Sequence, residues 1–164
     1  MPVQRVTEGG RPGYRWGEAG ATYTYREGDA ASEERARMRA EEQGRVIEQR
    51  MARAMDRTFQ PPAPVRKAAQ QALDLRASLP ASRRGMTAVG IARARDLANG
   101  RAVSMETVLR MRSYFARHAV DAEGEGWGVD SPGWQAWLGW GGDPGREWAE
   151  RIVSEYLEPS RFRA

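Results

Sequence analysis

The first 29 residues alternate aromatic and β-branched positions with polar ones and with glycine, a pattern typical of short strands. The runs Tyr14–Trp16 and Thr22–Tyr25 are separated by about four residues that include two glycines. Two such runs joined by a short glycine-containing loop predict a β-hairpin. Because an isolated hairpin is only marginally stable in water, we expect another element to cover it.

A long helix is predicted next, from Ser32 to about Arg57. This segment lacks proline and is dense in Glu, Arg, Ala and Met, and Ser32 is placed to cap its first turn. Its apolar residues recur at roughly helical spacing; they are Ala36, Ala40, Val46, Ile47, Met51 and Met55. The apolar stripe is thin, and Gly44 interrupts it at a cost of about 1 kcal/mol relative to Ala. We therefore expect a mostly exposed helix whose start packs on the hairpin.

Three prolines within residues 61–64 mark a boundary, since proline cannot occupy a helix interior and favours extended backbone. They predict a linker over residues 58–64. The predicted organisation is a hairpin and long-helix module over residues 1–57, this linker, a helical Trp-rich module over residues 65–158, and a tail over residues 159–164.

Helical periodicity returns beyond the linker. It predicts helices over residues 65–79, from the cap Thr87 to Ala98, from the cap Ser104 to about His118, and from the pair Asp143-Pro144 to just before Pro159. Residues 121–145 are loop-like apart from a short helical turn near Trp137. The predicted fold class is mainly α (α+β).

The composition removes much catalytic chemistry from consideration. The chain has no cysteine, a single histidine and a single lysine, Lys67. Disulfides, thiolate-bound metals and cysteine nucleophiles are excluded, and the phosphate-binding motif GxxxxGK[ST] is absent. His118 and Asp121 could form a fragment of an active site, but no nucleophile accompanies them. We expect a non-enzymatic protein without a cofactor, a metal or catalytic residues.

Charge is distributed unevenly between the two ends of the chain. Residues 1–119 hold 22 basic and 13 acidic groups, a net charge of +9, whereas residues 120–164 hold 4 basic and 9 acidic groups, a net charge of −5. Twenty-five of the 26 basic residues are arginine, which favours bidentate contacts with phosphate or carboxylate. The alternative explanation for the excess of arginine over lysine is a GC-rich genome, which encodes arginine often.

The sequence also bears on membranes. The first ten residues lack the apolar core of a signal peptide, and no stretch approaches the ~20 apolar residues of a membrane span, so we expect no membrane partner.

Residues 87–118 have the proportions of a helix-turn-helix unit, with Asn99-Gly100 ending the first helix. If the second helix enters a DNA groove, Arg101, Arg110 and Arg112 are the expected contacts. The alternative is an ordinary helical hairpin with a solvated arginine face.

Five of the six tryptophans lie within residues 127–148. Trp137, Trp140 and Trp148 are expected in the core, and Trp127 and Trp134 nearer the surface, where indoles can also stack on bases or sugars. The complete set of predicted partner or nucleic-acid contacts is Arg93, Arg95, Arg101, Arg110, Arg112, Arg117, Trp127 and Trp134.

Two groups of motifs resemble modules of tailed-bacteriophage and prophage genomes. The first comprises Pro2-Val3, then Tyr14-Arg15-Trp16-Gly17-x-x-Gly20-x-x-Tyr23, then Ala40-Glu41-x-Gln43-Gly44-Arg45-x-Ile47. It is similar to a module often found among head-morphogenesis genes. The second comprises residues 92–100, residues 113–121 and Trp140-Gly141-Gly142-Asp143-x-Gly145-x-x-Trp148-Ala149, and it is similar to a module found alone or fused to phage structural and protease-like proteins. The chain departs from this second pattern at Ala119 and Ala122, where an acidic and a basic residue are usual.

The resemblance implies a phage origin and a place near virion assembly, but it implies no reaction. We therefore expect a phage-encoded accessory or structural protein that docks through arginine-rich faces on a capsid, portal or neighbouring protein. Its expected location is the host cytoplasm, the virion or both. The alternative is a DNA-binding protein that uses residues 87–118.

Overall fold

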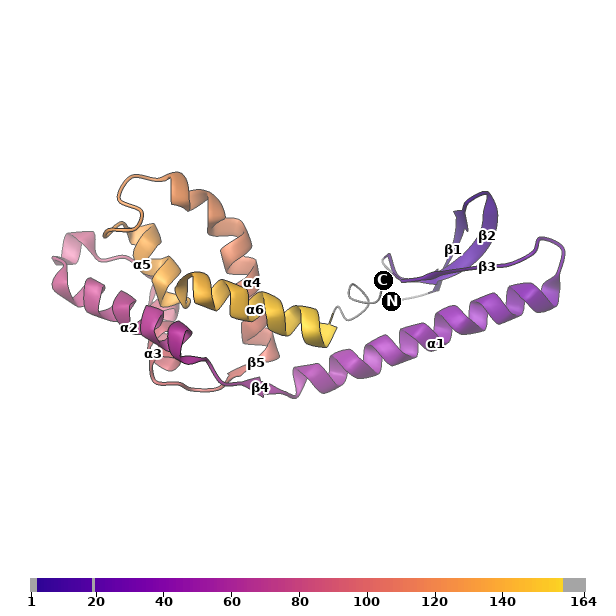
Figure 1. Ribbon diagram of the computed structural model, residues 1–164, viewed down its shortest axis with the longest axis horizontal. Helices are drawn as coiled ribbons and strands as arrows, with labels where there is room; N and C mark the ends of the chain where they lie inside the picture. The colour runs from indigo at the N-terminus through magenta and orange to yellow at the C-terminus, as the bar shows by residue number, and fades with distance from the viewer. Residues whose placement is uncertain (1–2, 19, 158–164) are drawn as a thin grey trace. The chain divides into compact units, whose positions relative to one another are not determined.

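The protein is mainly helical, with a small antiparallel sheet at its N-terminal end (Figure 1). The computed structural model describes residues 3–18 and 20–157, so the predicted tail over residues 159–164 lies outside the described residues. The chain divides into two compact units, Met1–Arg53 and Ala54–Ala164. The mainly α (α+β) class predicted from the sequence is confirmed. No helix among the described residues is long and apolar enough to cross a membrane.

Unit 1 contains a three-stranded antiparallel sheet in the order β1-β2-β3. Strands β2 (Arg11–Trp16) and β3 (Thr22–Thr24) form the predicted hairpin, with Tyr14 opposite Tyr23. Strand β1 (Val3–Glu8) is an addition that the sequence analysis missed. It joins β2 through Gly9 and Gly10, both at positive φ, and such a Gly-Gly pair is a recognised signal for a two-residue hairpin turn.

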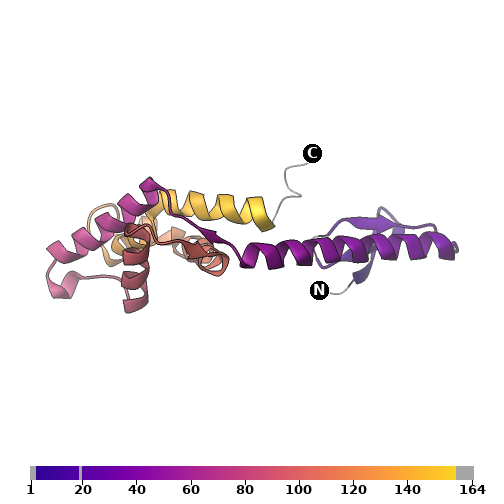
Figure 2. The ribbon, with the colours of Figure 1, turned by 90° about the horizontal axis from the view of Figure 1, so that it is seen from below.

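Helix α1 (Ala30–Met55) covers the sheet with its first half, as both views show (Figures 1 and 2). The Tyr14 hydroxyl donates to Glu33 at 2.9 Å, and the backbone N–H of Ala21 donates to Gln43 at 3.2 Å. The Trp16 ring lies directly against Gly44. The predicted packing of the start of the helix on the hairpin is therefore confirmed.

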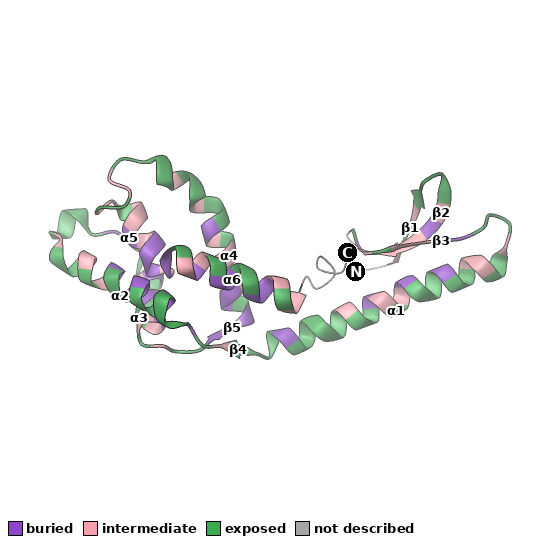
Figure 3. Ribbon diagram, viewed as in Figure 1, coloured by how far each residue is buried: buried purple, intermediate pink, exposed green. Residues whose placement is uncertain are grey.

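The apolar stripe of α1 is thin, as expected, and buried positions form only short patches along it (Figure 3). Ala36 and Ala40 are buried, whereas Val46, Met51 and Met55 are exposed. The helix begins two residues before the predicted cap Ser32. The reason is that Asp29 accepts a hydrogen bond from the backbone N–H of Ser32 at 2.9 Å and so caps the helix itself.

Unit 2 is built from helices whose ends agree closely with the sequence pattern. They are α2 (Ala63–Ser78), α3 (Ala88–Ala98), α4 (Met105–His118), α5 (Pro132–Gly139) and α6 (Gly142–Leu157), with short 3₁₀ turns η1 (Ala81–Arg83) and η2 (Ala119–Glu123). Thr87 and Ser104 cap α3 and α4, accepting from the N–H groups of Gly90 and Thr107. Helix α6 begins at Gly142, so Asp143 lies in its first turn.

The proline-rich segment holds regular structure within unit 2. Strand β4 (Thr58–Phe59) pairs with β5 (Val103–Ser104), placing Phe59 opposite Val103. Helix α2 then begins at Ala63, with proline in its first turn, where the missing N–H costs nothing. This pairing fixes residues 58–59 against the connection between α3 and α4.

The core of unit 2 is aromatic and aliphatic. Helix α4 packs on α6, and α2 packs on α3, α5 and α6. The largest side chains with almost no exposure are Phe115, Leu97, Met105, Met111, Gln135, Val65, Val108 and Val153. Trp137 and Trp148 are buried as predicted, while Trp140 is half-buried against the same cluster. Burial of these side chains supplies the dominant stabilisation of the unit.

Candidate partner-binding site

The predicted arginines of α3 and its C-terminal connection differ in how they are neutralised. Arg93 is mostly buried, and with Arg101 it shares one carboxylate, Asp96, at 3.8 and 3.4 Å. Arg95 is exposed, and within the described residues its side chain makes no hydrogen bond or ion pair. Arg95 is therefore the cation of this group whose charge is available to a partner.

The predicted arginines of α4 also divide. Arg110 pairs with Glu106 one turn earlier on the same helix, at 2.5 Å. Arg112 is half-buried and has a partner within the protein. Arg117 is exposed, and the part of the chain that the structure describes gives it no such partner. An exposed i,i+4 pair contributes only about 0.3–0.5 kcal/mol, so Arg110 can exchange its contact readily.

The two predicted surface tryptophans, Trp127 and Trp134, are half-buried and pack against the edge of the hydrophobic core. Trp127 meets Trp134 edge-on at 5.2 Å between ring centroids, and it meets Trp137 in the same way at 5.3 Å. Trp134 also packs against a small cluster that contains Ala72 and Leu138. Their geometry ties the loop before α5 to the core, and leaves only part of each indole for a partner.

His118 and Asp121 lie together at the end of α4. The His118 Nδ1 atom is 2.9 Å from Asp121 Oδ2, and the imidazole stacks on the Tyr114 ring at 4.5 Å between centroids. Tyr114 also stacks on Trp140 at 5.1 Å. Burial, reinforced by the negative charge of Asp121, raises the pKa of Tyr114 to about 12. These contacts hold the end of α4 against Trp140, and no serine or threonine nucleophile is hydrogen-bonded to the histidine in the described residues.

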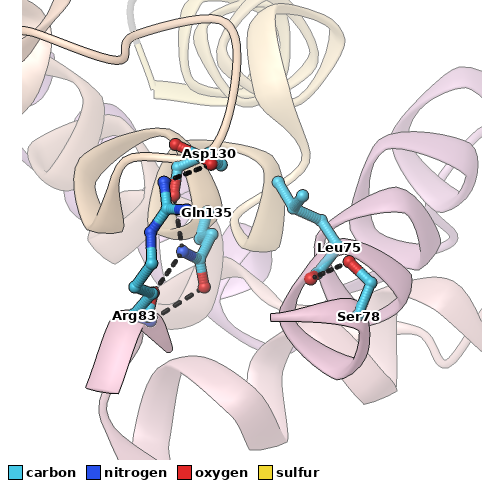
Figure 4. Close-up of polar contacts among 6 residues, drawn as sticks. Leu75, Ser78, Arg83, Asp130 and Gln135 are labelled. Atoms are coloured by element: carbon cyan, nitrogen blue, oxygen red, sulfur yellow. Dashed lines mark hydrogen bonds and ion pairs between the residues drawn. The ribbon is translucent and has the colours of Figure 1, made fainter. Parts of the chain in front are cut away.

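A buried glutamine organises the segment between α2 and α3 (Figure 4). Gln135 has no exposed surface, and its Oε1 atom accepts from the backbone N–H of Gly85 at 2.8 Å. Its Nε2 atom donates to the carbonyls of Arg83 and Asp130, at 2.9 and 2.8 Å. The Arg83 guanidinium also pairs with the Asp130 carboxylate. We call the three Gln135 hydrogen bonds, to Gly85, Arg83 and Asp130, the Gln135 clasp. It fixes the backbone that carries Arg83 and Arg84.

A groove beside this clasp was missed by the sequence analysis. It has a volume of about 400 Å³ and is lined by Leu73, Arg76, Ala77, Arg84, Ile91 and Arg95. Positions 73, 76 and 77 share one face of α2, and positions 91 and 95 share one face of α3. That spacing is readable in the sequence, but the packing of the two helices that joins the faces is not.

Arginines that gather in a groove without carboxylates can bind an anion through several directional hydrogen bonds. Of the residues that the structure describes, three arginines and no acidic residue line the groove. Among residues 3–18 and 20–157, no group of three or more His, Cys, Asp or Glu side chains is placed to hold a metal ion. The arrangement is therefore suited to electrostatic recognition.

Comparison with known proteins found no matching family model, curated protein or solved structure.

Proposed function

We propose that the protein is a phage-encoded, non-enzymatic docking protein of the virion or of its assembly pathway. Unit 2 holds arginines toward a negatively charged surface on a capsid, portal or neighbouring protein. The observation that carries the proposal is the exposure of Arg95 and Arg117, which have no internal ion pair in the described residues. The motif resemblance supports the phage context.

The contacts of the second resembling motif group favour a scaffold role. A Cβ atom on Gly145 would lie 2.6 Å from the Trp140 carbonyl oxygen and 3.4 Å from the Phe115 ring. Trp148 and Ala149 are buried in the core, and Asp143 is exposed at the start of α6. Gly145, Trp148 and Ala149 therefore have packing roles, as expected of a scaffold.

Quantitative mass spectrometry of purified phage particles tests the proposal. A tagged copy of the protein, expressed from its own phage genome, should co-purify with particles at a fixed copy number or with isolated assembly intermediates. Glu150→Gln is the control for tagging and expression, because it changes one exposed acidic side chain of α6, leaves the arginines intact and should co-purify like wild type. Abundant protein in the lysate, with none in particles or intermediates, would overturn the proposal.

DNA binding by residues 87–118 is the alternative. In a helix-turn-helix the two helices pack together so that the second can enter the groove. Here α3 packs mainly on α2 and α5, whereas α4 packs on α6, and the connection between α3 and α4 contains a strand. This packing favours protein docking over groove reading.

Fluorescence anisotropy with duplex DNA across a salt series separates the two functions. Each phosphate contact made by a DNA-binding surface should add about −0.9 to the slope of log affinity against log salt. The docking proposal expects weak binding to duplex DNA with no sequence preference. Tight, sequence-dependent binding that is lost in Arg110→Ala would establish the alternative.

A further inference from the structure

We propose that the groove between α2 and α3 binds an acidic protein segment, with carboxylates paired to Arg76, Arg84 and Arg95 and an apolar side chain seated on Leu73 and Ile91. This inference rests on the proposed docking function and names the site and the chemistry of the partner. It is independent of the face that carries Arg117.

The charge in the groove is uncompensated. Arg95 has no internal partner among the described residues, and Arg84 uses only its Nε–H, which donates to the Leu79 carbonyl at 2.9 Å. The Arg76 Nε atom is buried and has no hydrogen-bond partner among residues 3–18 and 20–157. Since no carboxylate among the described residues lines the groove, the three guanidinium groups offer their charge to an anionic partner.

The backbone around the groove is fixed before any partner arrives. Arg84 follows η1, and the clasp of Gln135 holds the backbone on both sides of it, at Arg83 and Gly85. The Arg84 bond to Leu79 holds the inner part of its guanidinium and leaves the terminal nitrogens to face a ligand. Such preorganisation lowers the entropy lost when a partner binds.

The mixed lining favours a peptide over nucleic acid. Leu73, Ala77 and Ile91 place apolar surface between the arginines. Single-stranded nucleic acid is typically held by aromatic platforms on which bases stack, and no aromatic residue from the described part of the chain lines this groove. A duplex presents phosphates without apolar groups at their side. A segment that alternates glutamate or aspartate with leucine or isoleucine matches both features of the groove.

The test uses the full chain and a short fluorescein-labelled peptide of alternating glutamate and leucine, with an all-glutamate peptide and duplex DNA as comparison probes. Wild-type protein should bind the mixed peptide most tightly, with an affinity that falls as salt rises. Losing charge-assisted hydrogen bonds worth about 1.5–3 kcal/mol in the double variant Arg84→Ala/Arg95→Ala should weaken binding at least about tenfold.

The matched control is Arg66→Ala/Arg151→Ala, which removes the same charge from exposed positions of unit 2 outside the groove and should retain wild-type affinity. Ile91→Ser should weaken the mixed peptide more than the all-glutamate peptide. Thermal unfolding checks that each variant is folded. Equal loss in the groove and control variants, no binding of the mixed peptide by wild type, or tighter binding of DNA than of peptide would each overturn the groove proposal. None of these results removes the protein from particles, so the docking function is tested separately.

Discussion

At the scale of single residues, the least expected feature of the sequence is Gly44 in the middle of α1. Helix propensity alone counts it as a defect of about 1 kcal/mol. The structure gives its reason, because a Cβ at this position would overlap the indole of Trp16. The glycine allows the sheet to approach the helix closely.

Gly44→Ala should therefore destabilise unit 1, although alanine is the better helix former. Overpacking against the Trp16 ring costs about 1–3 kcal/mol, which exceeds the helix-propensity gain of about 1 kcal/mol. Hydrogen exchange of the β2 amides in the full chain should quicken. In the double variant Trp16→Ala/Gly44→Ala the methyl group has room, so the two effects should not add. A single Gly44→Ala variant with slower exchange in β2 than wild type would contradict this account.

The stacked ring of Tyr114 makes a prediction about alkaline pH. Burial raises its pKa to about 12, above the value of about 10 expected in the unfolded chain. Its contribution to stability is therefore complete below about pH 10 and is lost as pH rises toward about 12. Chemical denaturation across this range should show a steeper loss of stability in wild type than in Tyr114→Phe. Identical pH profiles for the two proteins would contradict the assignment.

At the scale of elements, the helical spacing of apolar residues and the capping residues predicted most of the helices. Thr87 and Ser104 cap α3 and α4 as expected, because a hydroxyl followed by apolar positions at helical spacing is a local signal. The pairing of β4 with β5 was not predictable in this way, since it joins residues about 45 positions apart and each strand has only two residues. The prolines within residues 61–64 indicate a linker, so the sequence pattern does not reveal that Thr58–Phe59 forms β4.

The Gln135 clasp provides the sharpest test at this scale. In Gln135→Leu, the buried Gly85 N–H and the partly buried Arg83 and Asp130 carbonyls lose their partner. A buried group left unpaired costs about 1–3 kcal/mol, and the two carbonyls cost less because water can reach them. We expect unit 2 to lose about 2–4 kcal/mol of unfolding free energy, measured by denaturant titration with tryptophan fluorescence.

Gln135→Glu should also be destabilising, because a carboxylate can accept from Gly85 but cannot donate to the two carbonyls. Gln71→Leu, at an exposed position of α2, is the control and should change stability by less than about 0.5 kcal/mol. A wild-type denaturation midpoint for Gln135→Leu would mean that the clasp is not formed in solution.

At the scale of the whole molecule, the sequence predicted an arginine-rich surface but not which arginines are available. Composition shows the excess of positive charge before residue 120, but it does not show which arginines form ion pairs, such as that between Arg101 and Asp96. The groove lining was missed because Arg76 and Arg84 lie on different elements, and tertiary packing brings them beside Arg95. Local patterns therefore specify the scaffold, whereas the charged surface depends on how its helices pack.

Arginine-specific footprinting with phenylglyoxal, read by mass spectrometry, tests the central claim most directly. In the isolated protein, Arg95 and Arg117 should react readily, and Arg93, which is mostly buried, should react slowly. In purified particles or assembly intermediates, Arg95 or Arg117 should become protected by the negatively charged partner. Equal reactivity of both arginines in the free and assembled protein would contradict the claim that this surface makes the docking contact.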